Sequence, residues 1–494
     1  MSVVIAIDAG TTGVRAFALR EDGAAADFAY REFTQHFPRP GWVEHDASEI
    51  WATVQATLGE LAGRLTEPIA AVGITDQRET LVAWDRRSGQ PVHRAIVWQD
   101  RRTAARCDAL REAGHEPAVR SLTGLVLDPY FTATKAEWLL SDGAVAMTTD
   151  LALGTVDAWV LWNLTGGPDG GVFATEPSNA SRTMLFDIRS LAWSDELLDL
   201  FGIPAACLPE VRPSSGRFGL TTAGTGLPAG IPVSGIAGDQ QAALFGQACL
   251  EPGMTKNTYG TGSFVLMHVG DTCPEPVEGL LTTVGWTLAD GTRAYALEGA
   301  IFVTGAAVQW LRDGLGIIGE AAEVATLAGT VPDANGCVLV PAFTGLGSPW
   351  WDPYARGTIT GITRGTNRGH LARAVLESIS LQTRDVVTAM SAASGYPVRE
   401  LKADGGAAVN DLLLQLQADH LQVPVSRPVI QETTALGAAY LAGLAEGVWA
   451  STAEITANWR LDATFHASVD AAAADAQHAM WTRAVERSRG WATA

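Results

Sequence analysis

The fold is decided by the opening stretch of the chain, which reads VVIAIDAGTTGVRAFAL over residues 3–19. Val3 to Ile7 is a β-branched apolar run, Asp8 and a Gly/Thr turn follow it, and Val14 to Leu19 resumes the apolar pattern. Short β-branched runs on either side of a glycine-containing turn are typical of a β-hairpin. The sequence therefore predicts a strand, a tight turn and a second strand at this end of the chain.

A second stretch of the same design lies near the middle of the chain. Met254 to Tyr259 leads into Gly260-Thr261-Gly262, and an apolar run resumes from Phe264 to Val269. Similar segments half a chain apart indicate a duplicated architecture. We therefore expect two similar domains, 1–250 and 251–494, with the boundary in the loop just before the second hairpin.

Between and after the hairpins, helical patterns alternate with short apolar runs such as Ala70–Ile74, Ala95–Val97 and Val338–Val340. This alternation predicts α/β layers. The alanine-rich stretch Val469 to Ala484 predicts a surface helix. Because no low-complexity linker separates the two halves, we expect them to pack closely around a cleft.

The composition excludes several classes of partner. The chain has 494 residues, with 34 Lys and Arg against 54 Asp and Glu, so 34 − 54 gives a net charge of −20. Nucleic acids and anionic membranes bind basic surfaces, so neither is expected as a main partner. A phosphate ligand stays compatible with this charge, because it needs only a local positive site.

The cysteines and the apolar runs point to a cytoplasmic protein. There are five cysteines with wide spacing and no CxxC, which predicts reduced thiols rather than disulfides or a zinc site. The long uncharged stretch Phe218–Gly238 is rich in Gly, Thr and Pro, so no membrane helix is expected there. The apolar run before Asp8 is too short for a secretory signal.

The first hairpin carries a candidate phosphate site. Glycines let backbone N–H groups approach an anion, Thr11 and Thr12 add hydroxyl donors, and Arg15 adds a fixed charge. Asp8, at the end of a strand, is placed to hold Mg²⁺ directly or through water. The alternative is a plain hairpin turn with an aspartate cap, and the two interpretations are evenly matched on this segment alone.

Gly235–Ala243 carries a candidate general base. An apolar run ends in glycine, and Asp239 follows at a strand-to-helix turn, where a carboxylate can accept a proton from a substrate hydroxyl. The competing interpretation is an N-cap aspartate, which is the commoner use of this pattern.

Three further segments follow short strands. Arg78 and Glu79 offer hydrogen-bond donors and acceptors, and the nearby Trp98 offers a flat apolar wall. The same residues would also fit a cluster of ion pairs at the surface. In Asp404–Asp411, a double glycine precedes a predicted helix with Asn410 on its first turn. That arrangement suits a flat base or ribose, or simply a tight βα turn.

These segments occur together and in order, and the chain resembles the FGGY family of carbohydrate kinases, most closely its glycerol kinases. The resemblance covers the chain from Ile5 to about Val448. The motifs that carry it are GITDQRET at 73–80, AIVWQDRRT at 95–103, LDPYF at 127–131, GDQQAALFGQ at 238–247, KNTYGTG at 256–262, PAFTGLG at 341–347 and DGG at 404–406.

The resemblance implies an α/β fold of two ribonuclease-H-like domains around a central cleft, as in actin and sugar kinases. It implies transfer of the γ-phosphoryl group of Mg²⁺-bound ATP to a terminal hydroxyl of glycerol, with Asp239 as general base. By motif position, the polyol pocket would comprise Arg78, Glu79, Trp98, Tyr130, Asp239, Gln240 and Phe264. The phosphate and nucleotide site would comprise Thr11, Thr12, Gly13, Arg15, Thr261, Gly262, Gly305, Gln309, Gly406 and Asn410. A homo-oligomer, dimer or tetramer, is also implied.

The chain departs from the family pattern at several positions. Ala9 and Gly13-Val14 replace a usual Gln and Ser-Ser, Asp76 replaces a usual Asn beside the pocket, and Ala136 replaces a larger apolar residue. The loop Ala223–Leu227 lacks the arginine with which some relatives bind fructose 1,6-bisphosphate, so no inhibition by that effector is expected. A kinase for erythritol, dihydroxyacetone or xylulose is the alternative, and a non-catalytic binding protein is a more distant one.

Overall fold

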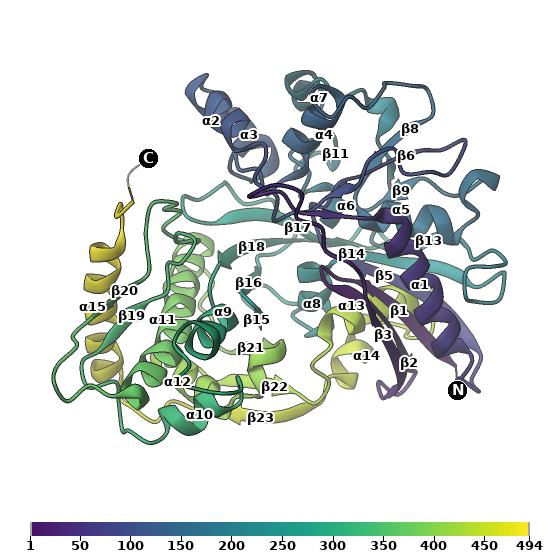
Figure 1. Cartoon of the computed structure of the whole chain (residues 1–494). Helices are drawn as coiled ribbons and strands as arrows, with labels where there is room; N and C mark the ends of the chain where they lie inside the picture. The colour runs from purple at the N-terminus through teal and green to yellow at the C-terminus, as the bar shows by residue number, and fades with distance from the viewer. Residues whose placement is uncertain (1, 493–494) are drawn as a thin grey trace.

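Two mixed β-sheets organise the computed structural model, which describes residues 2–492 (Figure 1). The first sheet has the order β13(Ser215–Leu220), β14(Pro232–Gly238), β5(Ile69–Asp76), β1(Val3–Ala9), β2(Gly13–Arg20), β3(Ala25–Glu32). The second has the order β17(Leu281–Thr287), β18(Arg293–Ile301), β16(Ser263–His268), β15(Thr255–Tyr259), β21(Leu401–Asp404), β22(Val425–Pro428), β23(Leu461–Phe465).

Both predicted hairpins are present, and each begins the same pattern of pairing. Strands β1 and β2 pair antiparallel, as do β15 and β16. The first strand of each hairpin then pairs in parallel with a later strand, β5 in the first sheet and β21 in the second. A further parallel strand, β14 or β22, completes each series. The expectation of two similar α/β halves is therefore confirmed in the topology.

Helices lie on these sheets and around the shorter strand pairs. In the first half they are α1(Ala47–Ala62), α2(Ala104–Glu112), α3(Glu116–Thr123), α4(Thr132–Leu140), α5(Val156–Leu164), α6(Pro177–Ala180), α7(Asp195–Phe201), α8(Asp239–Gly246). In the second they are α9(Gly305–Gln309), α10(Glu323–Ala328), α11(Arg368–Ser394), α12(Asp411–Leu421), α13(Thr433–Ala445), α14(Thr452–Asn458), α15(Ala471–Ser488).

Short paired strands complete the structure. They are β4(Glu44–His45) with β7(Ala95–Ile96), β6(Val82–Asp85) with β8(Leu151–Gly154), β9(Ala174–Thr175) with β12(Glu210–Val211), β10(Phe186–Asp187) with β11(Ala192–Trp193), and β19(Val338–Val340) with β20(Thr358–Thr360).

The central strands of the first sheet are buried on both faces. In β1, Val3, Ile5 and Ile7 belong to a core shared with α1 and α5. The intervening Val4 and Ala6 belong to a second core shared with α8 and α13. Because side chains alternate between the faces of a strand, the helices form two layers with the sheet between them.

The second of these cores joins the two halves. Besides residues of the first sheet, it contains Leu266, Trp286 and Ala296 from the second sheet. Helices α8 and α13 lie in this region, near the centre of the molecule in Figure 1. Helix α13 follows the second hairpin in sequence but packs on β1, β5 and β14 of the first sheet. The predicted boundary at 251 therefore stays a prediction, since packing and chain order divide the molecule differently.

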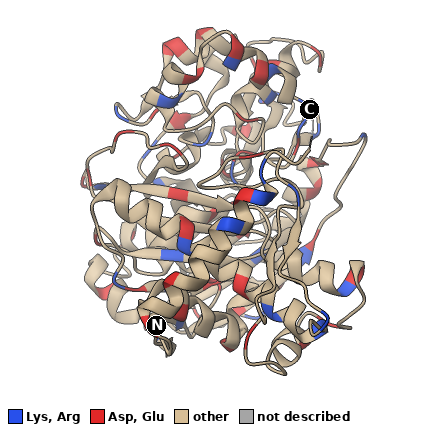
Figure 2. Cartoon of the chain, turned by 90° about the vertical axis from the view of Figure 1, so that its left-hand side faces the viewer, with Lys and Arg blue, Asp and Glu red and all other residues tan. Residues whose placement is uncertain are grey.

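Charged residues are dispersed over helices and loops of the molecule, as the ribbon in Figure 2 shows. The predicted C-terminal helix is confirmed as α15, although its Trp481 is fully buried, so one side of the helix belongs to a core. In the described part of the chain, no helix is long and apolar enough to cross a membrane.

Glycines allow α13 to approach its neighbours at backbone distance. A Cβ atom on Gly73 of β5 would lie 2.1 Å from the carbonyl oxygen of Ala438 in α13. A Cβ on Gly437 would lie 1.8 Å from the carbonyl oxygen of Ala242 in α8. Glycine is required at both positions because the opposing atoms are backbone and cannot rotate away.

We expect Gly437→Ala to lower the free energy of unfolding by at least about 2 kcal/mol, because overpacking a close backbone contact forces α8 and α13 apart. Thermal unfolding followed by circular dichroism measures this. Gly216→Ala is the control, since a Cβ at Gly216 meets nothing within 4 Å. Equal melting temperatures for the two variants would contradict the close approach.

Candidate active site

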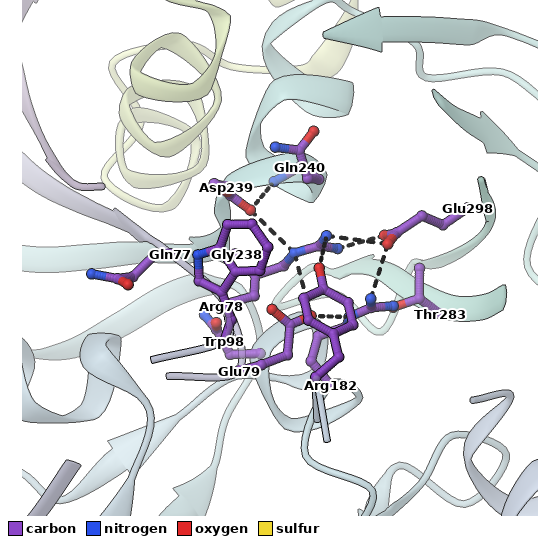
Figure 3. A network of polar contacts seen from close by, with 12 residues as sticks. Gln77, Arg78, Glu79, Trp98, Arg182, Gly238, Asp239, Gln240, Thr283 and Glu298 are labelled. Carbon is purple, nitrogen blue, oxygen red and sulfur yellow. Dashed lines mark hydrogen bonds and ion pairs between the residues drawn. The ribbon is translucent and has the colours of Figure 1, made fainter. Parts of the chain in front are cut away.

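The carboxyl ends of three parallel strands bring the predicted polar residues together. Ala9 of β1 is in register with Asp76 of β5, which is in register with Gly238 of β14. The residues that follow, Arg78 after β5 and Asp239 after β14, therefore emerge at one sheet edge. Arg78 Nε lies 3.1 Å from Asp239 Oδ1 (Figure 3).

Arg78 belongs to a buried ion network that joins the two halves. Its Nη1 and Nη2 lie 2.5 and 3.2 Å from the two carboxylate oxygens of Glu298, which lies on β18 of the second sheet. Arg182 donates from Nη2 to the same carboxylate at 2.9 Å and from Nε to Glu79 at 2.7 Å. Figure 3 shows the contacts of both guanidinium groups with Glu298 and of Arg182 with Glu79.

Glu298 is ionised despite its burial. Burial alone would raise the pKa of Glu298, but the guanidinium groups of Arg182 and Arg78 overcome this and hold it at about 2. Burial raises the pKa of Glu79, against the opposing effect of Arg78 and Arg182. Glu298 is completely inaccessible to solvent, so removal of its charge would leave Arg78 with Asp239 and Arg182 with Glu79 but without the carboxylate they share.

The aromatic residues predicted for the polyol pocket surround Arg78. Its Nη2 lies 3.4 Å from the Tyr130 hydroxyl, and its guanidinium carbon lies 5.9 Å from the centre of the Phe264 ring. Trp98 meets Tyr130 edge to face, with ring centres 5.6 Å apart. The indole N–H of Trp98 donates to Thr11 Oγ1 at 2.9 Å, which joins this cluster to the first hairpin.

Gln240, the last of the predicted polyol residues, lies beside Asp239 at the start of α8 (Figure 3). Its backbone N–H donates to Asp239 Oδ1 at 2.7 Å. The structure thus brings the polyol set predicted from the sequence into one connected cluster. Their roles in binding stay a prediction.

The tip of the first hairpin differs in detail from its expected form. Gly13 begins β2, and a Cβ there would lie 2.5 Å from the carbonyl oxygen of Arg31 and 2.8 Å from the Tyr30 hydroxyl. A serine at this position would therefore collide with β3, which explains why glycine stands here. Thr12 is exposed, and Arg15 forms a 3.2 Å ion pair with Glu432.

Asp8 suits a magnesium ion. Burial raises its pKa to about 7, and the Asp239 and Glu432 carboxylates add to this while Arg15 opposes it. A divalent cation at Asp8 would remove that penalty, and carboxylate oxygens are the ligands Mg²⁺ prefers. Among the described residues no group of three or more His, Cys, Asp or Glu could hold a metal ion, so phosphate and water oxygens would complete the coordination.

Asp76, a departure from the family pattern, contacts none of the predicted polyol residues through hydrogen bonds. Its carboxylate accepts from Asn179 Nδ2 at 3.0 Å and from the backbone N–H of Asp157 at 3.2 Å. Burial, followed by the charge of Asp157, raises its pKa well above the usual value. This residue supports the start of α5 rather than the pocket.

The second hairpin gathers most of the predicted nucleotide residues. The backbone N–H groups of Thr304 and Gly305 donate to the carbonyl oxygens of Thr261 and Gly260 at 2.9 and 3.0 Å, so α9 begins against the hairpin tip. A Cβ on Gly262 would meet the Ile301 carbonyl oxygen at 2.4 Å. Gln309, at the end of α9, is exposed.

The segment after β21 also reaches this hairpin. Gly405 has φ +85°, and a Cβ there would lie 2.6 Å from the Tyr259 carbonyl oxygen. Gly406 is exposed, and a Cβ on it would meet nothing within 4 Å. An open glycine beside a hairpin tip leaves room for a flat ligand.

The expectation that Asn410 lies on the first turn of a helix is wrong. Residues 406–409 form a 3₁₀ turn, and α12 begins only at Asp411. Asn410 is the N-cap, and its Oδ1 accepts from the Leu413 N–H at 3.1 Å. The cap uses the oxygen, so the amide NH₂ group is the part that stays available to a ligand.

Sequence reasoning missed Arg182, Glu298 and Lys256. Glu298 lies in the apolar run YALEGAIF, and a single carboxylate in such a run signals a buried ion partner. Lys256 lies in the second hairpin and is completely buried.

A cavity of about 330 Å³ lies away from this site, between α11, α15 and residues 333–339. It includes none of the predicted site residues.

The fold is duplicated, the tips of both hairpins are polar, and Asp239 begins the helix between the two sheets. This combination is typical of two-domain carbohydrate kinases. The chain belongs to the FGGY family of carbohydrate kinases. Residues 3–246 match the N-terminal domain of that family and residues 255–446 match its C-terminal domain.

Similar proteins cover the whole chain. The glycerol kinase of Trichlorobacter lovleyi is 56% identical over 499 residues, covering 100% of both chains. That of Carboxydothermus hydrogenoformans is 54% identical, covering 99% of this chain and 98% of its own. A crystal structure of Plasmodium falciparum glycerol kinase with ADP superposes with a TM-score of 0.91 at 32% identity, covering 99% and 98%. A xylulose kinase from Lactobacillus acidophilus, at 21% identity and a TM-score of 0.87, shares the fold.

These matches confirm two predictions from the sequence, the family and the fold of two ribonuclease-H-like domains. The protein is thus an enzyme of the carbohydrate kinase type.

We expect Glu298→Gln to lower the free energy of unfolding by about 3–5 kcal/mol, because it leaves Arg78 and Arg182 buried without their shared counter-charge. Denaturant titration measures this. Since the pKa of Glu298 is lowered from 4.5 to about 2, its contribution is complete above pH 4.5 and is lost as the pH falls toward 2.

Glu60→Gln is the matched control, since Glu60 also bridges two arginines, Arg31 and Arg64, but at the surface. We expect a much smaller loss there, because solvent screens exposed pairs. Similar losses in both variants would show that burial of the network contributes nothing.

Proposed function

We propose that this kinase transfers the γ-phosphoryl group of Mg²⁺-bound ATP to a terminal hydroxyl of glycerol, giving sn-glycerol 3-phosphate and ADP. The connected cluster of Arg78, Glu79, Asp239 and Gln240 with the Trp98 and Phe264 rings carries the proposal. A small triol needs several donors and acceptors together with apolar walls for its carbons. The full-length relatives named glycerol kinase support the same substrate.

Asp239 is proposed as the general base because of how its two oxygens are used. Arg78 Nε and the Gln240 N–H both contact Oδ1. Within the described chain, no hydrogen bond or ion pair is found at Oδ2, and the side chain is 31% exposed. Oδ1 thus fixes the carboxylate, and Oδ2 is left to accept the proton of the attacking hydroxyl.

The two hairpins would hold ATP between them. Thr11, Thr12 and Gly13 would bind phosphate oxygens, while Thr261, Gly262 and Gly305 would line the other side, with Gln309, Gly406 and Asn410 beyond. Arg15 would reach the phosphates when it leaves Glu432, its partner at 3.2 Å. Magnesium, held at Asp8, would neutralise developing phosphate charge. The ADP in the Plasmodium falciparum structure supports nucleotide use.

Location and assembly stay predictions. The five cysteines are free thiols, which suits the reducing cytoplasm. We expect a dimer or tetramer, on the family resemblance alone.

We expect Asp239→Asn to lower kcat for glycerol phosphorylation by about 10²–10⁴-fold, because an amide cannot accept the proton. A coupled assay of ADP release measures this. The glycerol KM should change far less, since Oδ1 and its contacts are kept. A variant that turns over at the wild-type rate would exclude Asp239 as the base.

We also expect kcat/KM to be highest for glycerol in a panel with erythritol, dihydroxyacetone and xylulose. The departures at Ala9, Gly13 and Asp76 motivate the panel. A higher value for another compound would reassign the substrate while keeping the kinase chemistry.

A further inference from the structure

Lys256 places a buried ammonium group beside the candidate site, and the proposed chemistry assigns no role to this group. It lies on β15 of the second sheet and is completely inaccessible to solvent. Its Nζ lies 2.5 Å from Gln240 Oε1, 2.8 Å from Thr258 Oγ1 and 3.3 Å from the carbonyl oxygen of Phe264. One side chain therefore joins the second hairpin to the start of α8 in the first half.

The chemistry of the ammonium group restricts what Lys256 can do. An ammonium has three N–H donors and no acceptor. All three donors already have oxygen partners, so none is left to bind a phosphate or a substrate hydroxyl. Lys256 must act through the groups it holds.

The same chemistry fixes the orientation of Gln240. The oxygen and nitrogen of a glutamine amide have nearly the same shape, so neighbours decide which way the amide faces. An ammonium repels an NH₂ group and attracts a carbonyl oxygen. The carbonyl oxygen of Gln240 must therefore face Lys256, and its NH₂ group must face away.

We propose that Lys256 is a positioning residue that determines specificity by turning the amide NH₂ group of Gln240 toward the substrate. The inference rests on the proposed function. Gln240 then donates to a substrate oxygen, while Asp239 next to it accepts a proton from another. A donor and an acceptor side by side recognise two neighbouring hydroxyls, one as acceptor and one as donor, which is the pattern of a vicinal diol.

The charge of Lys256 sustains this arrangement. Burial lowers its pKa to about 8, although nearby carboxylates oppose this. The charged groups that face it are Asp404, Asp239, Glu298 and Arg78, and the Cys249 thiol is also close. At pH values below about 8 the ammonium admits only the carbonyl oxygen of Gln240. As the pH rises through about 8, the neutral amine gains a lone pair, so the NH₂ group of Gln240 can turn toward it.

The first test is a double-mutant cycle on the glycerol KM. We expect Lys256→Met to raise the glycerol KM about tenfold, the effect of one hydrogen bond, with the ATP KM within about twofold of wild type. Gln240→Leu should raise the glycerol KM about tenfold in the wild-type background. In the Lys256→Met background it should raise the glycerol KM by less than about twofold. Equal effects of Gln240→Leu in both backgrounds would overturn the proposal.

Lys402→Met is the matched control. Lys402 is a buried lysine in register with Lys256 on the neighbouring strand, but its Nζ donates to the Gln247 carbonyl oxygen at 2.7 Å. We expect its glycerol KM to stay within about twofold of wild type. A rise as large as in Lys256→Met would assign the effect to general loss of packing.

A second measurement does not depend on the folding of any lysine variant. The wild-type glycerol KM should rise above pH 8, and in Gln240→Leu it should stay flat. A flat wild-type profile, or the same rise in both proteins, would overturn the proposal. Absence of glycerol phosphorylation by the wild-type enzyme would instead overturn the proposed function.

Discussion

The structure depends on one buried interaction, in which Glu298 of the second sheet pairs with both Arg78 and Arg182 of the first half. Two arginines without solvent are costly unless a carboxylate is held against them. That carboxylate comes from the other half of the molecule, so the cluster around Arg78 is built from both halves. The same network places Arg78 against Asp239 and Arg182 against Glu79, and the geometry of the site follows from it.

Strand register explains why residues far apart in sequence meet here. Because β1, β5 and β14 run parallel and in register, their ends deliver Asp8, Arg78 and Asp239 to a single edge. The second sheet repeats this arrangement, with the hairpin tip at Gly260 and the turn after Asp404 on neighbouring strands. A duplicated topology thus gives each half one sheet edge at which polar strand-end residues gather.

The hairpins and the strand-end residues were predictable because local patterns specify them. Glycine turns between β-branched runs located both hairpins, and the polyol set came from motif positions. The role of Glu298 could not be predicted, because its lone position in an apolar run indicates a buried partner but does not say that this partner is Arg78, 220 residues away. The start of α12 was misplaced because the double glycine resembled a helix boundary, whereas a 3₁₀ turn precedes the cap at Asn410. Gly13 became explicable only from the carbonyl oxygen of Arg31 across the sheet.

The position of α13 has a consequence for biosynthesis. One face of the first sheet packs on a helix that begins at Thr433, although the strands of that sheet are complete by Gly238. At about 5–20 residues per second, a ribosome needs roughly 10–40 s to make the intervening chain. During that interval Val4, Ala6 and Ala71 lack α13, one of the two helices that share their core in the finished structure. Chaperones that shield apolar surfaces thus have a defined time window and a defined face on which to act.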